Sequence, residues 1–215
     1  MKNFDAILEN YGVKRAEGLV FEGDAQHYAM QMPYYLVPEV ESTEASSEAA
    51  ASDYLTLAPF AQGIQKLDDV RDTVNIESIL TTSDSAYSKT NMNSSQIEKE
   101  EGDVDGPFDI GVSITESLAD GKETQLVYYS TANIIDSQIN QMVSGGNQQL
   151  VIESLKWLAD TEESASVSIP SKSLQVASLS LTEYDASFWK IWVIGIIPGV
   201  FLVFGFVIWF KRRRA

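Results

Sequence analysis

The segment IWVIGIIPGVFLVFGFVIWF, residues 191–210, decides how this chain is organised. It contains no charged and no strongly polar side chain, and a helix of this length measures about 30 Å, the thickness of a bilayer's hydrocarbon core. Trp189 and Trp209 lie near its two ends, where indole rings prefer the membrane interface, and Lys190 can extend to the nearer interface. A buried core helix is the alternative, but such a helix rarely has this length without a polar face. The segment therefore predicts one C-terminal transmembrane helix.

Basic residues follow this segment at once and indicate its orientation. They are Lys211, Arg212, Arg213 and Arg214. Positively charged segments beside a membrane helix are retained in the cytoplasm. The pattern predicts a single-pass protein of the cell membrane whose long N-terminal part lies outside the cytoplasm. The expected divisions are an extracytoplasmic acidic α/β domain, a juxtamembrane linker, the transmembrane helix and a cytoplasmic basic tail, at residues 1–183, 184–190, 191–210 and 211–215.

The N-terminal residues MKNFDAILENYGV do not have the form of an export signal, because they carry acidic residues early and no long apolar run. A domain outside the cytoplasm requires such a signal. We therefore expect the chain to be the C-terminal part of a longer protein with an earlier membrane segment. The alternative is a tail-anchored protein that faces the cytoplasm, which requires the basic tail to cross the bilayer.

Three residues inside the apolar segment favour contact with another helix. Gly195 and Gly199 are four positions apart, a spacing that lets a neighbouring helix approach closely. Pro198 lacks a backbone N–H and is expected to kink or loosen the helix at this point. The pattern indicates a helix-packing face, and the general abundance of glycine in membrane helices is the alternative explanation.

The rest of the chain is strongly acidic. The 215 residues carry a formal charge of −16, and residues 1–189 alone carry −21, because all 31 acidic residues precede position 190 while five of the 15 basic residues follow position 189. Such a domain is repelled by nucleic acid and by anionic lipid, so DNA and RNA are excluded as partners. An apolar content of 44% with nine Phe, nine Tyr and four Trp indicates a globular domain.

Few residues are available for catalysis. The chain has no cysteine, which excludes disulfides, thiolate metal sites and a cysteine nucleophile, and His27 is its only histidine. Ser130 ends a predicted strand and could be a nucleophile, but it has no G-x-S-x-G context and no histidine nearby in the sequence. There is no G-x-G-x-x-G or Walker motif for a nucleotide. We therefore expect no catalytic residue and no cofactor, and we predict that the protein is not an enzyme.

The acidic segment EGDVDGPFDIGV, residues 101–112, begins like a calcium-binding loop. Glu101, Asp103 and Asp105 alternate before Gly106. Pro107 occupies the seventh position of that loop, and Val112 occupies the position that requires a bidentate glutamate. We therefore interpret the segment as a solvated acidic turn and expect no metal site.

Hydrophobic periodicity predicts a layered α/β domain. One helix is expected at residues 3–11, and another begins at an N-cap, Asn147. The apolar stripe of the second helix consists of Leu150, Val151, Leu155 and Leu158, flanked by Trp157. Strands are expected at residues 18–23, 78–82, 108–117, 125–130 and 165–170. The acidic residues 41–53 are expected to form a loop, with a helix as the alternative. Because strands and helices alternate, we expect part of a doubly wound sheet of parallel strands.

Several short motifs together resemble a known family. In order they are YGV followed by GLVFEG, then ILTTSDSAY, GPFDIGVSI, QLVYYSTANIID, GGNQQLVIESLKWLADTEE and VSIPSKS, and finally an apolar span with a central proline that ends in KRRR. This pattern is similar to the C-terminal half of the gliding-motility-type ABC transporter auxiliary proteins, an uncharacterised component of ABC-type transport systems. Gly146-Asn147 and Trp157-Leu158 fit the family's pattern, whereas the turn Ser130–Asn133 departs from it.

The resemblance implies a glutamine-amidotransferase-like (flavodoxin-like) fold without a catalytic role, represented here by part of its layered domain. It also implies an ATPase and a permease as partners, with the ATP chemistry in those other chains. The leading hypothesis is thus a membrane-anchored auxiliary or substrate-binding-like subunit that docks on a permease through Gly195 and Gly199. The alternatives are a membrane- or tail-anchored adaptor unrelated to transport, and a membrane-anchored hydrolase that uses Ser130 or acidic residues.

Overall fold

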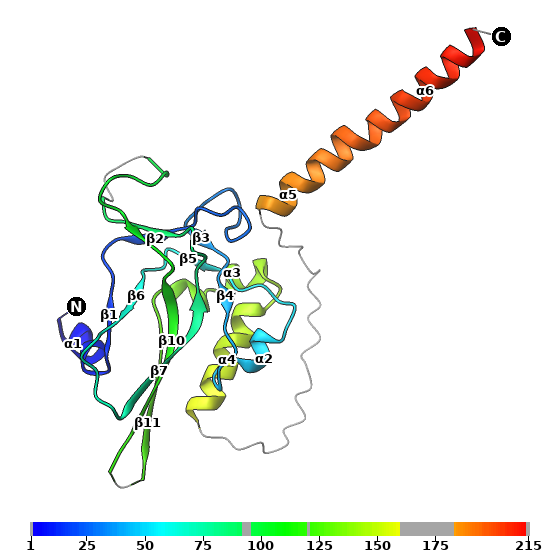
Figure 1. The fold of residues 1–215 in the computed structure, drawn as a ribbon. Helices are drawn as coiled ribbons and strands as arrows, with labels where there is room; N and C mark the ends of the chain where they lie inside the picture. The colour runs from blue at the N-terminus through cyan, green and yellow to red at the C-terminus, as the bar shows by residue number, and fades with distance from the viewer. Residues whose placement is uncertain (1, 92–95, 120, 160–182, 214–215) are drawn as a thin grey trace, which may run out of the picture.

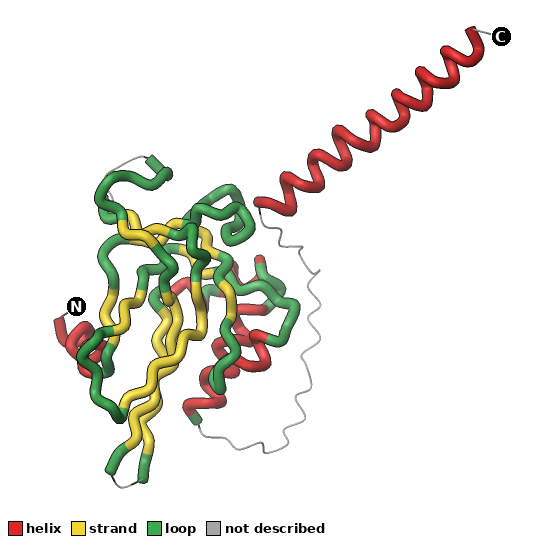
Figure 2. Tube along the Cα trace, viewed as in Figure 1, coloured by secondary structure: helices red, strands yellow, loops and turns green. Residues whose placement is uncertain are grey.

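The computed structural model describes residues 2–91, 96–119, 121–159 and 183–213. The N-terminal part of these residues folds into a mixed α/β unit, and the C-terminal part is helical (Figure 1). Figure 2 shows the strands of the α/β unit in yellow, with α1 on one side of them and α2, α3 and α4 on the other. The expected combination of an α/β part and a C-terminal apolar helix is confirmed.

A six-stranded antiparallel sheet forms the centre of the α/β unit. Its order is β1-β6-β10-β7-β4, and β11 also pairs with β10. The long strand β10 pairs with both β7 and β11 over most of its length. The six strands are β1 (Val13–Arg15), β4 (Glu39–Val40), β6 (Ile64–Lys66), β7 (Val74–Thr81), β10 (Asp109–Ser117) and β11 (Glu123–Tyr129).

The expectation of a parallel sheet is wrong for the described strands. Strand β10 is connected to β11 by residues 118–122 alone, and α3 (Ser137–Met142) and α4 (Gly146–Leu158) follow the last described strand. A connection this short joins antiparallel neighbours, because parallel neighbours require a crossover of a dozen or more residues. The flavodoxin-like order is therefore not the order of these strands.

Strand β10 supplies side chains to two apolar clusters. Its pairing with β7 shifts register on either side of Gly111, where a side chain would collide with the Tyr129 ring at 2.8 Å. Ile110 belongs to the main cluster, which lies against α4, while Val112 and Ile114 belong to a second cluster. An irregularity of this kind redirects the side chains that follow it. The predicted strand at residues 108–117 is confirmed, and it packs on both faces of the sheet.

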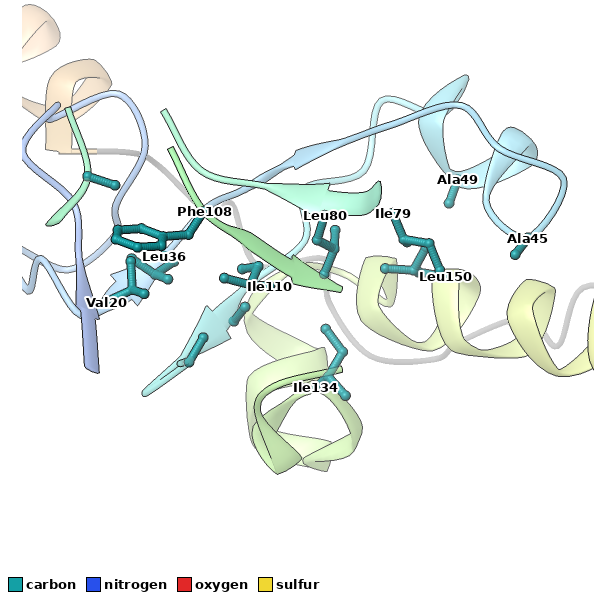
Figure 3. Close-up of a cluster of buried hydrophobic side chains, with 13 residues drawn as sticks. Val20, Leu36, Ala45, Ala49, Ile79, Leu80, Phe108, Ile110, Ile134 and Leu150 are labelled. Carbon is teal, nitrogen blue, oxygen red and sulfur yellow. The ribbon is translucent and has the colours of Figure 1, made fainter. Parts of the chain in front are cut away.

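The main core lies between the sheet and the helices that follow it. Figure 3 shows Leu150 of α4 beside Ile79 and Leu80 of β7, with Ile110 and Ile134 nearby. Leu150 and Ile79 are fully buried. A fully buried aliphatic side chain of this size stabilises a fold by about 2 kcal/mol relative to an exposed one. This packing fixes α4 against β7 and β10.

The second cluster lies under the N-terminal helix. Helix α1 (Lys2–Asn10) buries Leu8 against Val13 and Ile64, next to Val112 and Ile114. The helix ends before Gly12, which has a φ of +80°, so the predicted glycine stop is confirmed. Two small sheets complete the unit: β2 (Leu19–Phe21), β8 (Tyr87–Lys89) and β9 (Val104–Asp105) form one, and β3 (Tyr35–Leu36) and β5 (Ala58–Pro59) form the other.

Helix α4 differs from its prediction in two respects. Its N-cap is Gly145, not Asn147. The buried Asn147 amide instead accepts a hydrogen bond from Leu57 N–H at 2.9 Å and donates to the Leu57 carbonyl at 2.8 Å. The apolar stripe is also only partly correct, because Leu150 is buried and Val151 half-buried while Leu155 and Leu158 are 58% and 37% exposed. The buried face instead follows Gly146, Asn147, Leu150, Glu153 and Ser154.

The acidic segment at residues 41–53 contains one short helix, α2 (Ser47–Ala50), so the helical alternative holds for these residues. The strands predicted at residues 18–23, 78–82 and 125–130 correspond to β2, β7 and β11. Residues 184–190, which were expected as the juxtamembrane linker, belong to helix α5 (Glu183–Lys190). The strand predicted at residues 165–170 lies outside the described residues.

Candidate functional site

The C-terminal helix is the strongest candidate for a functional element. Helix α5 continues through η2 (Ile191–Ile196), a π-helical segment, into α6 (Ile197–Arg213). Residues Ser187–Arg213 form one helix of 27 residues that is long and apolar enough to cross a membrane, and its most apolar window has no buried residue. Phe201 and Ile194, for example, are both 73% exposed. An exposed apolar surface of this extent is typical of a segment that contacts lipid or another helix.

Pro198 lies at the point where the helix changes its hydrogen-bond pattern. The π-helical segment Ile191–Ile196 ends two residues before it. A proline inside a helix lacks the N–H that would bond to the fourth preceding carbonyl, and its ring crowds that carbonyl. A local π-helical turn is one way in which a helix accommodates this loss. The π-helical segment thus lies next to Pro198, and the predicted role of Pro198 in helix packing stays a prediction.

The glycines of the helix leave open positions along it. A Cβ atom added at Gly195, Gly199 or Gly205 would meet nothing within 4 Å. Gly205 also lines a shallow hollow of about 370 Å³ together with Leu202, Phe206 and Trp209. Sequence reasoning singled out Gly195 and Gly199 by their spacing and missed Gly205, which lies six residues further on. The composition of the segment around it, glycine between large aromatic residues, could have indicated this hollow.

Aromatic side chains gather at both ends of the apolar stretch. Phe188 contacts Trp189 and Trp192 near its start, with ring centroids 5.9 and 6.1 Å apart. At the other end the Arg213 guanidinium lies 5.3 Å from the centroid of the Trp209 ring, a cation–π contact. Both arrangements suit interfacial belts, where amphipathic rings and cations meet the lipid head groups.

The basic residues after the span are only partly described. Lys211, Arg212 and Arg213 form the last turn of α6, and Lys190 closes α5. Positive side chains at a helix C-terminus also interact favourably with its dipole. Arg214 lies outside the described residues.

The hydroxyl of Ser130 is used for structure. Its Oγ donates to the Ile110 carbonyl at 3.1 Å, and its backbone N–H donates to the same carbonyl at 2.9 Å. His27 contributes backbone bonds to the loop before β3, where its carbonyl accepts from Val37 N–H at 2.7 Å. Within the described part of the chain, no hydrogen bond joins Ser130 to His27. Among the described residues, the Ser130 hydroxyl bonds to a backbone carbonyl and not to a side chain that could act as a base.

Two hydroxyl-rich turns do meet at one end of the sheet. Strands β7 and β11 both run antiparallel to β10, so the C-terminal ends of β7 and β11 lie at the same end of the sheet. Ser83, after β7, donates to the Glu22 carboxylate at 2.6 Å, and Thr131, after β11, donates to the Pro59 carbonyl at 2.6 Å. Glu22 and Thr131 are buried. These hydroxyls therefore hold loops together.

The acidic segment after residue 100 is held by lysines. Lys89 Nζ, buried on β8, lies 3.0 Å from the Glu100 carboxylate and 3.5 Å from that of Asp103, while Asp105 is paired with Lys99. Burial acts to lower the pKa of Lys89, but the hydrogen bond that Lys89 donates to Glu100 and the charge of Asp103 raise that pKa above its usual value. Burial acts to raise the pKa of Asp103, but backbone N–H groups and Lys89 lower it. Among the residues described here, no cluster of three potential metal ligands occurs.

No protein-family model matches the chain, and no match was found among curated proteins or solved structures. The family resemblance therefore rests on the sequence motifs alone.

Proposed function

We propose that this chain is a non-catalytic, membrane-anchored auxiliary subunit of an ABC transporter that docks on a permease. The uncovered helix Ser187–Arg213 carries the proposal. Lipid can cover its large apolar side chains, and a second helix can approach where Gly195 and Gly199 leave space. The family resemblance supplies the identity of that second helix, as part of a permease.

In this proposal the acidic unit stands outside the cytoplasm and presents or contacts cargo beside the permease. The positive charges at the end of α6 support the orientation, and the formal charge of −21 on residues 1–189 keeps the unit soluble and away from anionic surfaces. The ATP chemistry belongs to partner chains. The proposal does not require the glutamine-amidotransferase-like fold implied by the resemblance, and the antiparallel pairings do not support that fold.

The orientation can be tested with single cysteines, since the chain has none of its own. Asp69→Cys places a thiol on an exposed loop of the acidic unit, and Ala215→Cys places one at the end of the basic tail. With a membrane-impermeant maleimide on intact cells, we expect labelling at position 69 and none at position 215 until the cells are opened. The reverse pattern would favour the tail-anchored adaptor and remove the transporter proposal.

Docking can be tested by filling the open positions of the helix. Gly195→Leu and Gly199→Leu together should reduce co-purification of the full chain with its permease at least tenfold, because a leucine at each position keeps the helices apart. Val193→Leu is the matched control, since it enlarges a side chain that is already 54% exposed and lies two positions from Gly195, on the opposite side of the same helix. Unchanged recovery of the glycine variant would show that this face does not dock.

A further inference from the structure

Two stretches of the α/β unit contain no charged residue. Residues 26–37 and 54–65 contain no Asp, Glu, Lys or Arg, although the chain around them is strongly acidic. The pairing of β3 with β5 brings these two stretches together, with Tyr35 opposite Pro59 and Leu36 opposite Ala58. A backbone hydrogen bond from Phe60 N–H to the Tyr34 carbonyl, 3.0 Å long, joins them again beyond the strands.

Large apolar side chains are exposed where the two stretches meet. Phe60, Met30 and Met32 are 46%, 45% and 38% exposed. The Phe60 ring stacks on Tyr34 with centroids 5.0 Å apart, and the Tyr34 hydroxyl lies 3.4 Å from the Met32 sulfur. We call Met30, Met32, Tyr34 and Phe60 the neutral patch. Its residue types, methionine and aromatic rings, are those that bind soft apolar partners.

The backbone under the neutral patch is strained. Met30 and Gln31 have φ values of +59° and +61°, and Phe60 has a φ of +55°. Met30 and Gln31 are the central residues of a turn that the Met32 N–H closes on the Ala29 carbonyl at 3.1 Å. Such a turn strongly prefers Asn-Gly, and a positive φ is unusual for a bulky residue such as Phe60. Neither Met30 nor Phe60 is buried, so burial does not explain why these residues hold strained positions. Strain of this kind concentrates at functional surfaces.

The length of the chain between the α/β unit and the C-terminal helix limits how far apart the two can lie. Residues 159–182 separate α4 from α5, a stretch that can span at most about 80 Å. A unit tethered in this way to a membrane-spanning helix meets the membrane at a high effective concentration, so a weak contact is sufficient.

The absence of charge on the neutral patch indicates which kind of partner it binds. A protein that binds so acidic a unit is expected to carry positive charges that face acidic residues. The neutral patch has no acidic residue that such charges could face.

We propose that the neutral patch inserts into the interface of a zwitterionic lipid bilayer and docks the acidic unit on the membrane that anchors it. Met30, Met32 and Phe60 enter the head-group region, while the surrounding acidic surface stays in water. This inference rests on the membrane anchoring in the proposed function, but not on the transporter or on the side of the membrane that the unit occupies.

The test uses the full chain in phosphatidylcholine nanodiscs. Single-cysteine variants Met30→Cys and Phe60→Cys carry a nitroxide spin label, whose exposure to oxygen, which concentrates in lipid, is compared with exposure to a water-soluble nickel chelate. Leu155→Cys is the matched control, because Leu155 is an exposed apolar residue, at 58%, on another element of the same unit. We expect the labels at positions 30 and 60 to shift towards oxygen and the label at 155 to remain accessible to nickel. A variant with Met30→Ser and Phe60→Ser, labelled at Gln31→Cys, should lose the shift.

A label at Val203→Cys in the apolar span distinguishes failure of the membrane anchor from failure of docking by the neutral patch. If the label at 203 lies in lipid while those at 30 and 60 are as exposed to nickel as that at 155, the anchor stands and the docking is wrong. If the label at 203 is also in water, the membrane anchor itself fails. Labels at 30 and 60 shielded from both reagents, with broadening between copies, would assign the patch to a second copy and overturn the proposal.

Discussion

Glu153 of α4 caps the N-terminus of α2, more than a hundred residues away in the chain. Its carboxylate accepts hydrogen bonds from Glu48 N–H at 2.6 Å and Ala49 N–H at 2.8 Å, and it also accepts one from the Ser47 hydroxyl at 3.2 Å. A negative group at this position satisfies N–H donors that have no partner within the helix and complements the helix dipole. Glu153 therefore joins the last helix of the α/β unit to a segment that precedes most of the sheet.

Replacing Glu153 should destabilise the unit. We expect Glu153→Ala to lower the free energy of unfolding by about 2 kcal/mol, because it leaves buried N–H groups unsatisfied. Glu153→Gln keeps one acceptor oxygen and should cost about half as much. Ser47→Ala is the control, since it removes only the hydroxyl that donates to Glu153. Urea unfolding of the full chain in detergent micelles, followed by near-ultraviolet circular dichroism, measures the three variants. Equal stabilities for Glu153→Ala and Ser47→Ala would show that the cap contributes little.

This cap also shows what sequence reasoning could and could not find. The helix at residues 2–10, the strand at 109–117 and the apolar helix were predictable, because each has a periodicity or length that decides its form locally. The cap, the Asn147 contacts with Leu57 and the exposed Leu155 were not, because they depend on which segments meet. Asn147 has the residue type of an N-cap, yet it is the second residue of the helix and its side chain is bonded to Leu57. The parallel sheet was expected from the order of elements, and the short connection between β10 and β11 decided otherwise.

Tyr129 should make stability depend on pH in alkaline solution. Burial raises the pKa of Tyr129 to about 12 from its ordinary 10.0, the hydrogen bond with Ser154 acts to lower it, and the charge of Glu153 raises it. Between pH 10 and 12 the unfolded chain loses this proton while the folded chain keeps it. Stability is therefore fully present below pH 10 and decreases as the pH rises, by on the order of 2 kcal/mol in total.

The comparison of wild type with Tyr129→Phe isolates this contribution. The variant should show a shallower loss of unfolding free energy between pH 10 and 12, measured by urea unfolding at several pH values. Part of the slope should remain, because the pKa values of Tyr87, Tyr128 and Lys89 are also raised. A wild-type slope that the substitution leaves unchanged would mean that Tyr129 ionises in the folded chain as readily as in the unfolded one.

Relieving the strain in the turn of the neutral patch should increase the stability of the unit and decrease its contact with the membrane. The double variant Met30→Asn, Gln31→Gly supplies the residues that a turn with two positive φ values prefers. We expect it to stabilise the unit by about 1 kcal/mol and to reduce the lipid contact of a label at Phe60→Cys in phosphatidylcholine nanodiscs. Thermal unfolding gives the first quantity and oxygen accessibility the second. As a control, the same change in stability should appear in detergent, where no bilayer is present. A variant that loses stability would show that the wild-type turn is not strained.

Gly205 provides a test of which side of the C-terminal helix is covered. Gly205 lines a hollow with Leu202, Phe206 and Trp209, and a Cβ atom added at Gly205 would meet nothing within 4 Å. If a neighbouring helix packs there, Gly205→Leu should weaken co-purification with the permease as strongly as the pair Gly195→Leu and Gly199→Leu, since a leucine fills the hollow. If only the Gly195 and Gly199 face packs, Gly205→Leu should behave like the Val193→Leu control. Membrane insertion should be the same for all variants, because each change keeps the helix apolar. Cysteine labelling at position 69 verifies that insertion, so a loss of co-purification with normal labelling can be assigned to helix packing alone.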